Sequence, residues 1–277
     1  MARKFPWTIF LLLLFCVVSI SARHSYAENR VALILGNGAY VHTSPLRNPV
    51  NDAEKLSEAF QKMGFTVLRG IDQTKSGMDE QIGLFSRKLQ GAGLAVFFYA
   101  GHGIQINSRN YLVPVDFDPE KGSDLTTQLI RLDDILHELE KGKQNNIIFL
   151  DACRDNPMAD QLASSLAKGR SMTIDQDRGV KYVSKGLAEV EGKAGTLIAY
   201  ATQPGNIALD GVGPNSPFTE SLLKHIETPG LEIRDMLTKV RASVMGITKE
   251  KQIPWDHSSL VKDVYFKKKN RGFAPPP

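Results

Sequence analysis

The stretch LAVFFYAGHG, residues 94–103, decides the fold of this chain. Its first seven residues are all apolar or aromatic, and a strand without a polar side is typical of a parallel sheet buried on both faces. Similar runs alternate along the chain with amphipathic segments, which is the pattern of helices covering both sides of such a sheet. We therefore expect an α/β fold.

The same patterns predict the remaining elements. We expect further strands at residues 31–35, 66–72, 110–117, 146–153, 195–202 and 263–269. We expect helices within residues 48–65, 75–93, 131–142, 216–227 and 232–248. Together they predict one domain over residues 28–268, in which residues 154–194 lose the periodicity and are expected to form a long mobile loop. The Pro-rich tail, residues 269–277, is expected to be disordered.

Composition limits the class of protein. A chain of 277 residues with 42% hydrophobic side chains can bury a sizeable core. Its net charge of +4 comes from 34 basic and 30 acidic residues spread along the chain. No basic patch with interleaved aromatic residues is evident, so we expect no nucleic-acid partner.

Residues 1–27 are typical of a secretory signal peptide. Arg3 and Lys4 precede an apolar run that extends to about Ile20, and small residues suit cleavage after the tripeptide SYA. We expect export to a bacterial periplasm or medium, with no stable membrane association after cleavage. The alternative is an uncleaved anchor, although the run is near the short end of the ~17 to 25 residues that span a bilayer.

Cysteine usage singles out one thiol. The chain has two cysteines, Cys16 and Cys153, and Phe15 is too large to precede the lipidated cysteine of a lipoprotein. Removal of the signal leaves Cys153 alone, which excludes an internal disulfide. An odd cysteine in an exported protein is a candidate reactive thiol.

Two candidate catalytic residues follow neighbouring buried strands. His102 lies between glycines after residues 94–100, and Cys153 follows the apolar run of NNIIFLDAC. Ligands of parallel sheets bind beyond the carboxyl ends of the strands, so we expect imidazole and thiol to meet at one edge. A histidine can take the thiol proton and later protonate a leaving amine. The amides of Gly103 and Cys153 would stabilise an oxyanion.

Either residue also has an ordinary explanation. A cysteine at a strand end is often a small buried hydrophobe, and a single histidine is often structural. The residues alone leave both possibilities open.

These motifs resemble a family. DACRD is close to the caspase signature around the nucleophilic cysteine, with its histidine about 50 residues upstream. YAGHG is similar to the histidine motif of caspase-like peptidases. The similarity extends through VALILGNGAY, PLRNPVNDAEKL, NYLVPVDF and NSPFTESLL to QIPWDHSSL, and is strongest to bacterial caspase-like proteins of the metacaspase and orthocaspase type.

The resemblance implies the caspase-hemoglobinase fold, a three-layer sandwich with a mainly parallel six-stranded sheet. It also implies a monomeric cysteine endopeptidase with His102 as general acid/base and Cys153 as nucleophile. Asp151 stands where caspases have glutamine, and the metacaspase pattern places a second acid at Asp52. Two carboxylates in the pocket would attract Arg or Lys and repel Asp, so we expect cleavage of proteins or peptides after basic residues. The alternatives are a helix N-cap for Asp52 and a hydrogen-bonded strand-end acid for Asp151.

Calcium is a further implication. The chemistry itself requires no cofactor, but many metacaspases bind calcium through a cluster of aspartates. The residues at similar positions are Asp116, Asp133, Asp134 and Asp160. Carboxylates suit calcium, although each of these also suits a turn or a helix start.

The segment after Cys153 is a candidate for self-cleavage, because a pocket that prefers basic residues would accept its own. The candidates are Lys168, Arg170, Arg178, Lys181 and Lys185. The alternative is a solvated loop with no processing.

Two other functions compete with the peptidase. A caspase-like domain can serve as a binding or regulatory module, although the presence of both His102 and Cys153 argues against this. GNGAY, residues 36–40, could cradle a phosphate, but it lacks the full G-x-G-x-x-G spacing.

Overall fold

The computed structural model describes residues 29–121, 124–152, 157–169, 171–174, 178–184 and 186–269. Its centre is a six-stranded sheet in the order β12-β11-β7-β3-β1-β2. Only β12 is antiparallel to its neighbour. The strands are β1 (Arg30–Gly36), β2 (Thr66–Ile71), β3 (Leu94–Ala100), β7 (Asn145–Asp151), β11 (Thr196–Tyr200) and β12 (Trp255–Ser258). The expected mainly parallel α/β sheet is confirmed.

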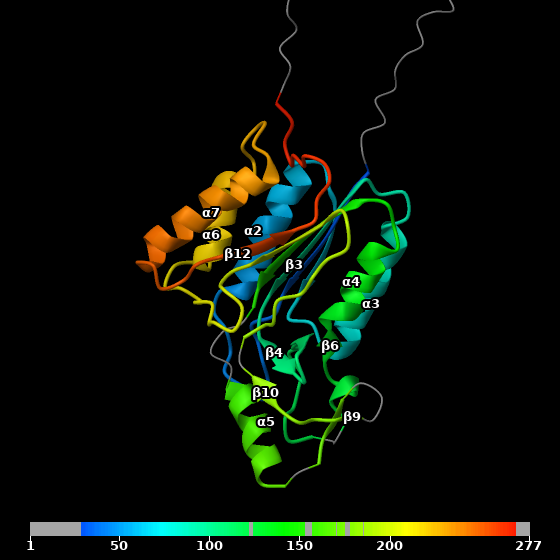
Figure 1. Cartoon of the computed structure of the whole chain (residues 1–277), viewed down its shortest axis with the longest axis vertical. Helices are drawn as coiled ribbons and strands as arrows, with labels where there is room; N and C mark the ends of the chain where they lie inside the picture. The colour runs from blue at the N-terminus through cyan, green and yellow to red at the C-terminus, as the bar shows by residue number, and fades with distance from the viewer. Residues whose placement is uncertain are drawn as a thin grey trace, which may run out of the picture.

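Two layers of helices cover the sheet, as Figure 1 shows. One layer contains α2 (Pro49–Lys62), α6 (Pro217–His225) and α7 (Ile233–Thr248), and the other contains α3 (Lys75–Lys88) and α4 (Leu132–Glu140). Successive β1 side chains serve opposite layers: Ile34 shares a core with Phe60 of α2, and Leu33 shares one with Phe85 of α3. A strand with two buried faces must be apolar throughout, which explains the unbroken run in β3.

A second, antiparallel sheet follows the carboxyl end of β3. Its order is β10-β4-β5-β6, with β4 (Gly103–Ile106), β5 (Arg109–Leu112), β6 (Ile130–Arg131) and β10 (Val183–Ser184). Asn107 and Ser108, with φ of 49° and 65°, form the two-residue turn between β4 and β5, a conformation that suits tight hairpins. The strand expected at residues 110–117 is therefore β5, and it belongs to this sheet instead of the parallel one.

The expectation of a loop throughout residues 154–194 is wrong. The segment contains α5 (Pro157–Ala167) and the paired strands β8 (Thr173–Ile174) and β9 (Arg178–Gly179). The short helix η1 (Leu125–Thr127) packs against β8. Met158 and Leu162 of α5 are buried in one core cluster with Ile104 and Ile106 of β4. One short apolar face, surrounded by polar residues, hid this helix in the sequence.

The strand expected at residues 263–269 is also wrong, because the terminal strand is β12. Val264 and Phe266 are buried beside α2, and the rings of Phe266 and Phe60 lie 5.4 Å apart. The carbonyls of Tyr265 and Phe266 accept hydrogen bonds from the Arg30 guanidinium at 3.1 and 2.6 Å. The apolar pattern of this segment therefore comes from packing on the helical layer.

The contact of Arg30 with Phe266 places both ends of the described chain at one end of the molecule, uppermost in Figure 1. The carboxyl ends of the parallel strands point the other way, toward β4 and α5. No helix within the described ranges is long and apolar enough to cross a membrane.

Candidate active site

The strand pairing brings the two catalytic motifs to one place. In the parallel β3–β7 pair, Ala100 stands opposite Asp151. The Gly101 amide then donates to the Asp151 carbonyl at 3.3 Å. Cys153 itself lies outside the described residues, and the description of β7 ends with Ala152.

Gly103 packs closely against the cysteine motif. A Cβ added at Gly103 would lie 3.3 Å from Cβ of Ala152 and 3.0 Å from Cδ2 of Leu187. Glycine therefore allows β4 to pass close to the residue that precedes the thiol. The role of the Gly103 and Cys153 amides in binding an oxyanion stays a prediction.

His102 is fully buried, and a backbone carbonyl fixes its ring. Its Nε2 lies 3.0 Å from the carbonyl oxygen of Ser44. A carbonyl only accepts hydrogen bonds, so Nε2 must carry the proton and, in the neutral ring, Nδ1 is the basic nitrogen. This tautomer is the one that a general base acting through Nδ1 requires.

Two tyrosines, Tyr40 and Tyr99, hold the histidine backbone. The Tyr40 hydroxyl accepts from the His102 amide at 2.7 Å, and the Tyr99 hydroxyl donates to the His102 carbonyl at 2.8 Å. The Tyr40 ring also lies against the imidazole, with centroids 4.4 Å apart. A Cβ at Gly101 would come within 2.6 and 2.7 Å of the two hydroxyls, which explains a glycine before the histidine.

Asp52 does not cap a helix, which corrects the N-cap alternative. The cap position of α2 is Asn48, and Asp52 lies in the first turn with no exposed surface. Its Oδ1 accepts from Nδ2 of Asn215 at 2.8 Å and from the amide of Ser216 at 3.0 Å. This helix residue is thus held by a segment more than 160 positions away.

Asp151 is also fully buried and hydrogen-bonded at the end of β7. Its Oδ2 accepts from the hydroxyl of Ser216 and, at 3.4 Å, from the hydroxyl of Thr219. Ser216 therefore contacts both carboxylates. The structure brings Asp52 and Asp151 together as expected, and it adds donors at the start of α6 that sequence reasoning missed.

The loop before α6 is tied to the segment that carries Ser44. The Arg47 amide donates to Oδ2 of Asp210 at 2.9 Å, and Nδ2 of Asn51 donates to the Pro214 carbonyl at 2.6 Å. The histidine and the two carboxylates are therefore positioned by the same pair of loops, which close the carboxyl end of the sheet.

The phosphate-cradle alternative loses its donors. The amides of Gly38 and Ala39 both donate to Oδ1 of Asp72, at 2.7 and 2.9 Å. A carboxylate of the chain itself thus occupies the position where a phosphate would bind.

The four aspartates of the expected calcium set are Asp116, Asp133, Asp134 and Asp160. Oδ1 of Asp116 accepts from the Lys75 amide at 2.9 Å, and Asp134 forms an ion pair with Arg131. Asp160 is exposed on α5, at the far end of the molecule from α4 in Figure 1. Among the described residues, no three His, Cys, Asp or Glu side chains form a group that could hold a metal. Calcium binding stays a prediction.

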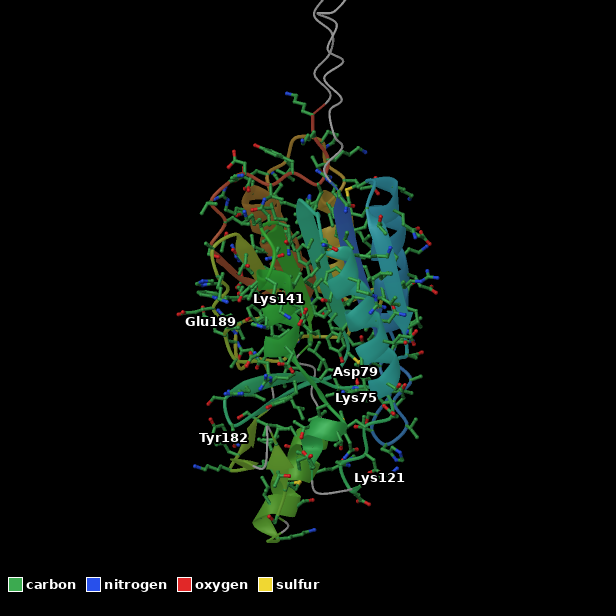
Figure 2. All side chains as sticks on the ribbon, turned by 90° about the vertical axis from the view of Figure 1, so that its right-hand side faces the viewer. Lys75, Asp79, Lys121, Lys141, Tyr182 and Glu189 are labelled. Carbon is green, nitrogen blue, oxygen red and sulfur yellow. The ribbon has the colours of Figure 1, made fainter. Side chains whose placement is uncertain are left out.

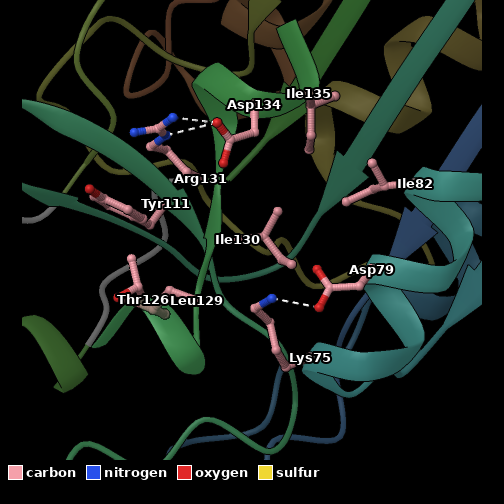
Figure 3. Close-up of a pocket in the computed structure, with 10 residues that line it drawn as sticks. All are labelled: Lys75, Asp79, Ile82, Tyr111, Thr126, Leu129, Ile130, Arg131, Asp134 and Ile135. Atoms are coloured by element: carbon pink, nitrogen blue, oxygen red, sulfur yellow. Dashed lines mark hydrogen bonds and ion pairs between the residues drawn. The ribbon is translucent and has the colours of Figure 1, made fainter. Parts of the chain in front are cut away.

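A separate pocket of about 290 Å³ lies between α3, β6 and α4 (Figure 3). Two ion pairs stand at its rim, Lys75 with Asp79 at 2.6 Å and Arg131 with Asp134. Figure 2 shows Lys75 beside Asp79 on this side of the molecule, with Lys121 nearer to the end formed by α5. Neither His102 nor the acids at 52 and 151 line the pocket.

A parallel α/β sheet with a buried histidine and two acids at its carboxyl edge is the arrangement expected of a caspase-like peptidase. The model of the caspase domain family matches residues 29–265. The chain therefore belongs to the caspase domain family.

Individual relatives are distant. Mucosa-associated lymphoid tissue lymphoma translocation protein 1 of Homo sapiens is 28% identical over 128 residues, which are 46% of this chain and 15% of that protein. Its Mus musculus homolog matches to the same extent. Caspase-7 of Gallus gallus is 26% identical over 228 residues, which are 78% of this chain and 69% of the relative. The chain thus spans only about 15% of the first two proteins.

Proposed function

We propose that the chain is a cysteine endopeptidase that cleaves proteins after Arg or Lys through a dyad of Cys153 and His102. The observation that carries the proposal is the register of Ala100 with Asp151, because each proposed catalytic residue follows one of these partners by two positions. Membership of the caspase domain family supports the reaction class.

In the proposed reaction, Nδ1 of His102 takes the proton of the Cys153 thiol. The thiolate attacks the carbonyl carbon of the scissile bond, and the amides of Gly103 and Cys153 stabilise the oxyanion. His102 then donates the proton to the leaving amine, which leaves a thioester on Cys153. Water, deprotonated by His102, attacks the thioester, and the carboxylic acid departs as the thiol is restored.

Substrate selection is proposed to depend on Asp52 and Asp151. Carboxylates bind a guanidinium or ammonium group through charge-assisted hydrogen bonds and repel an acidic side chain. Both acids accept hydrogen bonds from neutral donors of the chain, so their negative charge is not neutralised by those contacts. A basic side chain of the substrate would supply the opposite charge.

We also propose export to the periplasm or medium, directed by residues 1–27, which lie outside the described residues. The described chain begins at Asn29, at the end of the molecule opposite the dyad. A retained anchor would therefore leave the active site pointing away from the membrane. N-terminal sequencing of the secreted or membrane-bound protein distinguishes the two outcomes.

Self-processing in residues 154–194 is proposed for the same pocket. Lys168 at the end of α5 and Lys181 between β9 and β10 are exposed; Arg170 and Lys185 lie outside the described residues, and of Arg178 only the backbone is described. Mass spectrometry of the purified wild-type chain beside Cys153→Ala would detect fragments that depend on the thiol. A single intact wild-type species with full activity would contradict required processing.

The test uses fluorogenic peptides ending in Arg, Lys or Asp, with wild-type protein and Cys153→Ala, with calcium and with a chelator. We expect thiol-dependent cleavage of the Arg and Lys peptides. Cleavage of the Asp peptide alone would contradict the acidic pocket. Absence of thiol-dependent activity on every peptide in both conditions would favour a binding or regulatory module.

A further inference from the structure

The start of α6 contacts both acids of the proposed substrate pocket. The amide of Ser216 donates to Oδ1 of Asp52 at 3.0 Å, and its hydroxyl donates to Oδ2 of Asp151. All three residues are fully buried. Ser216 therefore lies between two carboxylates that come from distant parts of the chain, α2 and β7.

The Ser216 hydroxyl has two roles that fit one oxygen atom. It is the N-cap of α6, where it accepts from the Thr219 amide at 3.0 Å. Because its lone pair takes that amide hydrogen, its own hydrogen remains available for Asp151. The helix cap thus fixes the direction in which the hydroxyl donates.

Two buried carboxylates at close range repel each other, and each requires donors that do not cancel its charge. Ser216 supplies one donor to each acid, and Thr219 supplies a longer second one to Asp151 at 3.4 Å. The unpaired amides of the first turn of a helix also favour negative charge nearby. The start of α6 therefore stabilises the two acids in their charged form and at a fixed separation.

We infer that Ser216 is a positioning residue for substrate specificity: it holds Asp52 and Asp151 as one paired site that accepts a single basic side chain. This inference rests on the proposed function. It assigns the choice of basic substrates to three residues, with Ser216 acting through the two acids and making no contact with the reacting bond.

The experiment compares two peptides that differ only in the residue before the scissile bond, Arg or its neutral analogue citrulline. The ratio of their kcat/KM values measures recognition of the charge. The variants are Ser216→Ala, Ser216→Thr, Thr219→Val and a cap control, Thr74→Ala. Thr74 caps α3 in the same way, with Oγ1 accepting from the Gly77 amide at 3.2 Å, but it contacts neither acid.

We expect Ser216→Ala to lower the Arg/citrulline ratio by at least about tenfold, mainly by raising KM for the Arg peptide. Cleavage of the citrulline peptide should stay within about threefold of wild type, because the dyad is not touched. Ser216→Thr should restore the ratio. Thr74→Ala should lower the melting temperature and leave the ratio unchanged.

A wild-type ratio near one would overturn the proposed function and, with it, this inference. A wild-type preference for Arg that survives in folded Ser216→Ala would overturn the inference alone. If Ser216→Ala does not fold, Thr219→Val decides, because it removes one donor to Asp151 and leaves the cap oxygen in place. An unchanged ratio in that variant would then count against the positioning role, and a smaller fall in the same direction would support it.

Discussion

Ala100 and Asp151 are partners in the parallel β3–β7 pair, and the chain leaves both strands at the same level. Equal steps beyond this pair lead to His102 on one strand and to position 153 on the other. The sheet register thus accounts for the meeting of two motifs that are distant in the sequence.

Replacement of His102 by alanine should lower kcat/KM on an Arg peptide by at least about 10²-fold, the usual contribution of a general acid/base. Cys153→Ala should abolish turnover. Both variants should melt as cooperatively as the wild type, which circular dichroism would check. Comparable activity in folded His102→Ala would contradict the dyad.

Tyr40→Phe should destabilise the protein. The change leaves the buried amide of His102 without the hydroxyl that accepts its hydrogen bond, which costs about 1–3 kcal/mol. The matched control is Tyr182→Phe, because Tyr182 is 45% exposed and should change stability by no more than about 0.5 kcal/mol. Urea denaturation measures both. Equal stability of the two variants would contradict the role of Tyr40 in holding the histidine.

Gly101→Ala should reduce both stability and kcat. The added Cβ would lie 2.6 and 2.7 Å from the Tyr99 and Tyr40 hydroxyls, and such overpacking costs about 1–3 kcal/mol. Gly246→Ala is the control, since this position in α7 has open space around it and alanine should stabilise the helix by about 0.5–1 kcal/mol. Opposite shifts of the two melting temperatures are expected. A stabilised Gly101→Ala protein would show that the contacts at the histidine are not tight.

Acid should destabilise the α6–α7 pair through His225. Burial, with Lys224 and Lys239 nearby, lowers the pKa of His225, whereas the unfolded histidine has a pKa of about 6.5. The unfolded chain therefore binds the proton more readily, and stability falls as pH decreases below about 6.5. His225→Gln, which can still hydrogen-bond to Ser243, should flatten the pH dependence of the melting temperature between about pH 7.5 and 5.5. Parallel curves for the two proteins would contradict this assignment.

Asp151→Asn should lower cleavage after Arg by about 10- to 100-fold, because a charge-assisted hydrogen bond contributes about 1.5–3 kcal/mol. Cleavage of a citrulline peptide should change much less. Asp235→Asn, at an exposed position of α7, should leave both rates unchanged. An equal loss on both peptides would indicate damage to the dyad instead of altered recognition of charge.

The sequence predicted the main sheet because its strands carry their burial on both faces, as the unbroken apolar run of β3 shows. It also predicted that residues at positions 102 and 153 would meet, because both follow the ends of neighbouring buried strands. Patterns of this kind depend on local side chains alone.

The missed features depend on contacts between distant segments. Nothing in residues 36–47 indicates that the Tyr40 hydroxyl and the Ser44 carbonyl hold His102, since both contacts span about 60 positions. The cap signal at Ser216, a serine before proline at the start of an apolar helix, was visible, but its bond to Asp151 required the fold. The terminal strand was misplaced because Val264 and Phe266 alternate for packing reasons.

The central claim is tested most directly by labelling with two peptidyl chloromethyl ketones that differ only in carrying Arg or Asp next to the reactive group. The account predicts that the Arg reagent alkylates Cys153 rapidly in the wild type and slowly in His102→Ala, with the adduct located by peptide mass spectrometry. The Asp reagent should react far more slowly. Faster labelling by the Asp reagent, or absence of an adduct on Cys153 with either reagent, would contradict a thiol peptidase directed to basic residues.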